Sequence, residues 1–219
     1  MRQAGSVGSH LLTNLMIAEN SGKIYRFKLD FDLGYGFAEV YDFTDELSMF
    51  DGRLVYVYNK HDKQEKSNYE FSEIRKTGIA FGPIRLHKFP NTRGLHSWKY
   101  LFKTDKFLTK QLPETKELHK LTMDDDNWNN FKYWYRSSCD IKNPIVYIDY
   151  EEVRYLETRI INAPSGIVKK FTMKIILDNK EKVSDYYDLS ELGNKNMFVQ
   201  MINTYYPLAK TKTFLKQIP

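Results

Sequence analysis

An alternation of apolar and charged residues over 25–33 constrains this chain more than any other feature of its sequence. Apolar side chains stand at every second position, and Arg26, Lys28, Asp30 and Asp32 stand between them. Because successive side chains of a β-strand point to opposite faces, this spacing predicts a strand with one buried and one solvated face. Such half-solvated strands are typical of antiparallel sheets.

Further β-branched and aromatic runs, separated by turn residues, continue this pattern. They are 37–41, 53–58, 79–81, 84–89, 98–102, 131–136 and 145–148. Residues 69–76 fit either a short helix or an edge strand, and 104–130 reads as a long loop. We therefore predict a mainly β (α+β) fold, with a curved antiparallel sheet or small barrel over residues 23–158.

The last quarter of the chain, residues 159–219, is expected to form a small α+β attachment. Its apolar run 171–177 predicts a strand. Apolar residues at helical spacing over 197–205 predict a helix that Pro207 ends. Residues 1–22 show neither pattern and are expected to be a flexible leader.

The net charge of +5 lies entirely in this attachment. Residues 159–219 hold 10 basic and 5 acidic side chains, whereas 23–158 hold 22 of each. A basic surface with interleaved aromatic residues can bind nucleic acid, so a nucleic-acid-binding module is the alternative function. Its candidate residues are Lys169, Lys170, Lys174, Lys210 and Lys212. A solvated lysine-rich face is the simpler interpretation, because Arg159 is the sole arginine of this segment.

The chain carries one cysteine, Cys139, so it cannot form an internal disulfide. A lone cysteine is typical of proteins that fold in a reducing interior. No stretch approaches the roughly 20 apolar residues that a membrane-spanning helix requires. We therefore predict a cytoplasmic protein without a membrane partner.

The residue types that carry catalysis do not stand together in the sequence. The histidines are scattered and none pairs with another at a metal-ligand spacing: His10, His61, His87, His96 and His119. Cys139 has no neighbouring glycines that would supply an oxyanion hole, and the chain has no Gly-x-Ser-x-Gly motif. We predict that the protein is not an enzyme and uses no metal or cofactor.

Acidic residues are the candidates for contact with a partner protein. Asp124, Asp125 and Asp126 form a cluster, and Asp45 and Glu46 lie in a second acidic turn. Neither site completes a calcium-binding loop, so both are expected to be solvated. The same carboxylates can contact a basic partner protein.

Several of the predicted strands together resemble the bacterial family called immunity protein 26. The matching segments are 23–29, 33–40, 51–58, 81–84 and the pair Trp98–Lys99. Members of that family are similar in opening with a strand, a glycine-marked turn and a second strand. They are predicted to neutralise bacterial toxins by binding rather than by catalysis. The resemblance implies a non-catalytic immunity protein whose partner is a cognate toxin, and it assigns no catalytic residue.

Overall fold

The computed structural model describes most of the chain and leaves several segments out. The described residues are 21–43, 52–93, 97–105, 108, 115–120, 131–136, 146–148, 150–158 and 161–219. Ser21 and Gly22 fall in the predicted leader, yet both are bonded to the sheet. Asp42 N–H donates to the Ser21 hydroxyl (2.7 Å), and Gly22 N–H donates to Val40 O (3.0 Å).

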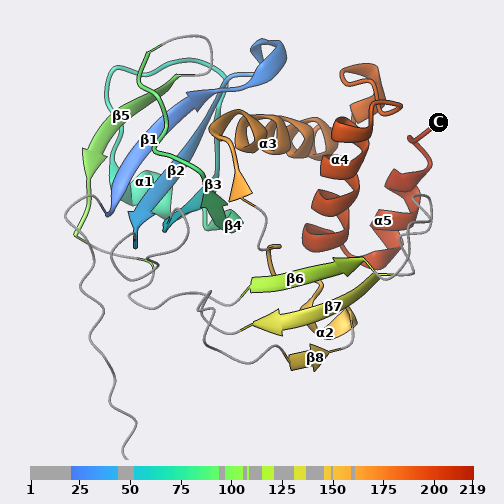
Figure 1. The fold of residues 1–219 in the computed structure, drawn as a ribbon. Helices are drawn as coiled ribbons and strands as arrows, with labels where there is room; N and C mark the ends of the chain where they lie inside the picture. Colours follow the sequence, from blue (N-terminus) through green and yellow to red (C-terminus); the bar gives the residue numbers. More distant parts are fainter. Residues whose placement is uncertain are drawn as a thin grey trace, which may run out of the picture.

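The main sheet is open and almost entirely antiparallel (Figure 1). Its strands are β1 (Lys23–Lys28), β2 (Tyr35–Asp42), β3 (Arg53–Asp62), β4 (Ile79–Leu86), β5 (Trp98–Lys103) and β9 (Ile161–Asn162). They lie in the order β5-β1-β2-β3-β4-β9, and β9 pairs with β4 in parallel. The predicted antiparallel sheet is confirmed. Because β5 and β9 form opposite edges, the sheet is not closed into a barrel.

The predicted strand over 25–33 is shorter than its alternation suggests. β1 ends at Lys28, and the 3-10 turn η1 (Asp30–Asp32) follows. Phe31 and Asp32 have left-handed φ angles of 57° and 54°, so the backbone turns where the pattern predicts extension. Phe31 is consequently 49% exposed and packs edge-on against Tyr186 and Tyr187.

Smaller elements complete the N-terminal part of the chain. Residues 69–76, left open between helix and strand, contain the helix α1 (Phe71–Arg75). A second sheet of three antiparallel strands consists of β6 (Thr115–Lys120), β7 (Phe131–Arg136) and β8 (Val146–Ile148). β6 was not predicted, since it lies inside the expected loop 104–130. The short helix α2 (Tyr150–Val153) follows β8.

The C-terminal segment is helical, and the prediction of a strand at 171–177 is wrong. Its elements are α3 (Pro164–Asp178), the 3-10 turn η4 (Val183–Asp185), α4 (Leu192–Tyr205) and α5 (Leu208–Leu215). Pro164 stands in the first turn of α3, a position where its missing N–H costs no hydrogen bond. Ten of the fifteen residues of α3 are buried, so the helix lacks the polar face that gives a 3.6-residue period. A buried helix of this kind cannot be told from a strand by periodicity.

Helices cover both faces of the main sheet (Figure 1). On one face Phe171 of α3 packs edge-on against Phe27 of β1 and Phe81 of β4, at 5.9 Å between ring centroids in each case. On the other face Tyr58 of β3 contacts Phe71 of α1. The largest core cluster joins residues of β1 to β5 with residues of α3, η4 and α4. One hydrophobic core therefore spans the sheet and the C-terminal helices.

Candidate functional site

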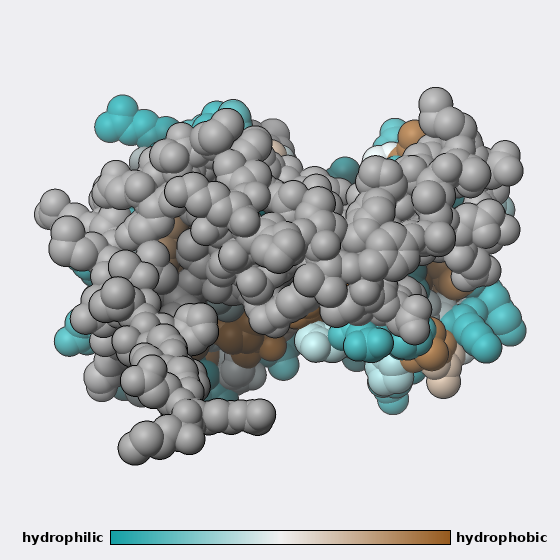
Figure 2. Space-filling view, turned by 60° about the horizontal axis from the view of Figure 1, so that its bottom comes forward, coloured by the Kyte–Doolittle hydropathy of each residue, from teal (hydrophilic) through white to brown (hydrophobic). Residues whose placement is uncertain are grey.

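An open groove of about 1050 Å³ lies between the end of α3, η4 and α5. We call it the lysine groove, after its charged lining residues Lys180, Lys182, Lys210 and Lys216. Leu177, Tyr206, Ala209 and Phe214 also line it and form its apolar floor. Figure 2 shows hydrophobic and hydrophilic residues side by side on the side of the molecule where α4 and α5 lie. The groove therefore combines positive charge with a surface that can take an apolar side chain.

Local contacts fix the walls of the lysine groove. The buried Thr211 hydroxyl donates to Ile202 O (3.0 Å), which holds α5 against α4. Val183 N–H donates to the Gln217 side chain (2.8 Å), which ties η4 to the end of the chain. Phe214 packs edge-on against Tyr206 at 5.1 Å. Because both walls are held by such contacts, the groove is formed before any partner arrives.

Positive charge exceeds negative charge in the lining of the lysine groove, which holds four lysines against Asp178 and Glu181. Lys180, Lys182, Lys210 and Lys216 are exposed, and the described residues form no ion pair with them. The two carboxylates in the lining are already engaged. Asp178 pairs with Lys174 and accepts from Tyr206 (3.3 Å), and Glu181 accepts from Tyr186.

Of the five lysines predicted for nucleic-acid binding, only Lys210 is among the described residues that line the lysine groove. Lys169 donates to Asn194 (2.8 Å), and Lys174 donates to Asn59 (2.9 Å) and pairs with Asp178. Lys210 and Lys212 stand on α5, and of these two only Lys210 lines the lysine groove.

Lys170 lies inside the protein and is out of reach of an external ligand. Its side chain pairs with Glu157 (2.6 Å) and lies over the rings of Phe81 and Tyr205, at 5.3 and 5.0 Å. Tyr205 also donates to Glu157. This network links α3 and α4 to the segment that follows α2, and its role is structural.

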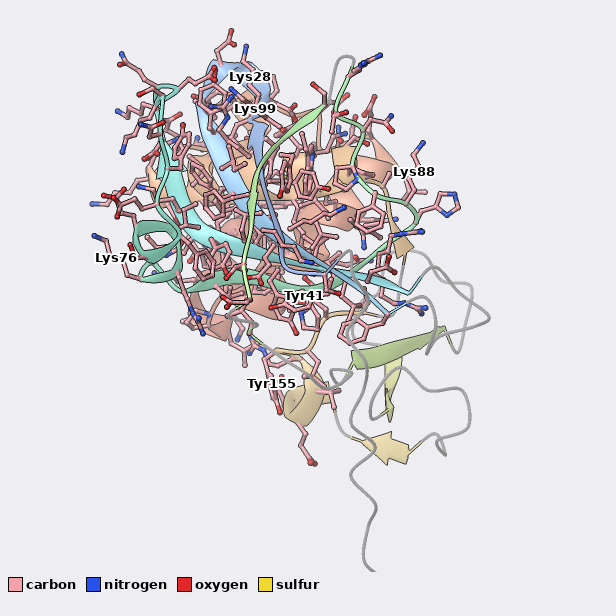
Figure 3. The ribbon with its side chains drawn as sticks, turned by 90° about the vertical axis from the view of Figure 1, so that its left-hand side faces the viewer. Lys28, Tyr41, Lys76, Lys88, Lys99 and Tyr155 are labelled. Atoms are coloured by element: carbon pink, nitrogen blue, oxygen red, sulfur yellow. The ribbon has the colours of Figure 1, made fainter. Side chains whose placement is uncertain are left out.

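A buried carboxyl group on the α1 face of the sheet is the other unusual electrostatic feature. Glu39 of β2 is fully buried and accepts hydrogen bonds from Tyr41 (2.7 Å) and Tyr58. Tyr41, which Figure 3 shows away from the outward-pointing lysines, accepts in turn from Leu108 N–H (2.5 Å). Burial raises the pKa of Glu39, whereas the hydrogen bonds from the two tyrosines and the charge of Arg75 lower it. The effect of burial is the larger, so the pKa lies above its ordinary value.

Several sequence candidates lie outside the described residues. These are Asp45, Glu46, Asp124, Asp125, Asp126 and Cys139, together with His10 and His96. His87 is exposed and lies directly after β4. Within the described ranges, no three His, Cys, Asp or Glu side chains come together in a way that could hold a metal ion.

Two further findings concern the chain as a whole. Among the described helices, none has both the length and the apolar character needed to cross a membrane. No family model, curated protein or solved structure matches the chain.

Proposed function

We propose that this protein is a non-catalytic immunity protein that binds and neutralises a cognate bacterial toxin in the cytoplasm. The observation that carries the proposal is the lysine groove. It offers four exposed cations around an apolar floor, on walls fixed by internal contacts. A surface that is already formed and carries an excess of positive charge is suited to hold a partner of complementary charge.

The chemistry of the lining supports binding over catalysis. A nucleophilic mechanism needs an activated nucleophile within hydrogen-bond reach of a base. In the described part of the chain, the groove lining contains neither histidine nor cysteine. Its serine and threonine, Ser184 and Thr213, are exposed, and Thr213 donates to Ala209 O (3.3 Å) within α5.

The segments that resemble immunity protein 26 also support the proposal. They fall in β1, β2, β3, β4 and the start of β5, which are neighbours in one sheet. The lysine groove lies outside that sheet, on α3, η4 and α5.

Binding is tested by a pull-down between the tagged protein and the product of the toxin gene beside its own gene. We expect a complex that survives gel filtration and releases unmodified toxin after denaturation. A toxin from an unrelated gene cluster is the negative control. If this protein is folded and the cognate toxin still elutes separately from it, the proposal is contradicted.

A further inference from the structure

We infer that the lysine groove binds an acidic segment of a partner protein, anchored by one apolar side chain. The inference rests on the proposed function, because the partner it describes is the toxin. It adds the location of the contact and the chemistry of the segment that makes it.

Charge is the first argument. Lys180 and Lys182 follow the end of α3, whereas Lys210 stands on α5 and Lys216 directly after it. Two walls of the groove therefore present cations toward the same space. A bound segment with carboxylates at several positions can pair with both walls, and such complementarity raises association rate and selects the partner.

The apolar floor is the second argument. Leu177 is buried and Phe214 half-buried, whereas Ala209 is an exposed small residue of α5 that leaves space above the floor. One leucine or phenylalanine side chain from a partner would cover this floor. Anchors of this kind, surrounded by polar contacts, carry most of the binding energy in protein interfaces.

The same lining disfavours nucleic acid as the occupant. Among the residues that the structure describes, the lining has no arginine, although arginine makes the bidentate contacts that phosphate and guanine prefer. The ring of Tyr206 packs on Phe214 and its hydroxyl is bonded to Asp178, so it is not presented for base stacking.

Two lysines of α5 provide a matched pair of variants. Lys210 lines the groove and Lys212 does not, although both are exposed and stand on the same helix. Lys210→Glu and Lys212→Glu therefore change the net charge identically and differ in position alone. Ala209→Trp is a third variant, which fills the space above the floor without changing the charge.

The probe is a short fluorescein-labelled peptide that combines several glutamates with one phenylalanine, measured by fluorescence anisotropy. We expect the wild-type protein and Lys212→Glu to bind it alike, and Lys210→Glu and Ala209→Trp to bind at least about tenfold more weakly. A peptide with glutamine at each glutamate should not bind. Three results would overturn the inference. The first is that Lys210→Glu and Lys212→Glu weaken binding equally, and the second is that the wild-type protein does not bind the peptide. The third is that a single-stranded oligonucleotide binds more tightly than the peptide and through the groove.

Repeating the comparison with the toxin separates this inference from the proposed function. If the wild-type protein and both lysine variants bind the toxin equally, the function stands and the groove is not its contact. If the acidic peptide binds through the groove but the toxin does not bind at all, the site stands and the toxin is not its partner. Loss of toxin binding in Lys210→Glu with retention in Lys212→Glu supports both.

Discussion

Glu39 illustrates how a single buried side chain can make stability depend on pH. Its carboxyl group lies between Tyr41 and Tyr58 on the α1 face of the sheet, away from water. Burial raises its pKa above the ordinary value of 4.5 because the charged form loses its hydration. The folded state therefore favours the protonated acid more strongly than the unfolded state does.

The sign of the pH dependence follows from that shift. The stabilising contribution of Glu39 is complete below about pH 4.5 and is lost as the pH rises through the raised pKa. Because a glutamine side chain cannot ionise, Glu39→Gln should gain stability relative to wild type as the pH rises, by about 1.4 kcal/mol per unit of raised pKa. Urea unfolding of both proteins across this pH range measures the difference. A difference that stays constant with pH would show that Glu39 is not desolvated.

The ion pair between Lys170 and Glu157 is buried, so its contribution to stability can be tested by substitution. Lys170 is 8% exposed and pairs with Glu157, itself buried. Lys170→Met leaves Glu157 as an uncompensated buried charge and should cost about 3–5 kcal/mol in unfolding free energy. Lys99→Met, which removes an exposed partner of Glu65, is the control and should change stability little. Denaturant unfolding measures both losses of free energy. Equal losses in Lys170→Met and Lys99→Met would mean that the Lys170–Glu157 pair is not buried.

Contact between α3 and the sheet depends on a glycine of β2. A Cβ at Gly36 would come within 2.6 Å of the Phe27 ring and 2.7 Å of the Phe171 ring. Gly36→Ala should therefore push α3 from the sheet and destabilise the protein by about 1–3 kcal/mol. Thermal unfolding, followed by circular dichroism, measures this loss.

Gly193 supplies the matched control for that prediction. It lies in α4, and a Cβ there would meet nothing within 4 Å. Because alanine favours helix more than glycine does, Gly193→Ala should leave stability unchanged or raise it by up to about 1 kcal/mol. A destabilisation as large as that of Gly36→Ala would refute the steric argument.

How far the elements can be predicted depends on how each one is buried. β1 and β3 were predicted from their own residues, because a half-buried or β-branched strand leaves a local pattern. α3 was misread because it is buried on most sides, and η1 because Phe31 continues the alternation of β1 through a turn. α5 was missed, since its lysine and threonine positions leave few apolar residues to count.

The lysine groove was beyond sequence reasoning for a different reason. Lys180, Lys182 and Lys216 were counted in the charge excess but were not among the five lysines named as candidate site residues. Lys180 and Lys210 come together through the packing of α5 beside the end of α3. No local spacing contains that information, so the charge excess could be assigned to 159–219 but not to a site.

The shared core makes a prediction for the whole molecule. Residues of the sheet and of α3 belong to one buried cluster, so the two parts should open together. In native-state hydrogen exchange, amides of β2 and α3 should report opening free energies within about 1 kcal/mol of each other. If the amides of α3 report a much lower opening free energy than those of β2, the sheet and the C-terminal helices are separate folding units with a boundary near residue 158.

The central claim is that the protein acts by binding, and the stoichiometry of inhibition tests it most directly. The activity of the purified cognate toxin is measured while this protein is added in increasing amounts. A tight binding protein removes activity in proportion to its concentration, so we predict a linear loss that ends at one equivalent. Complete inactivation by a small fraction of an equivalent would reveal catalysis, and full toxin activity at excess protein would exclude an immunity function for this toxin.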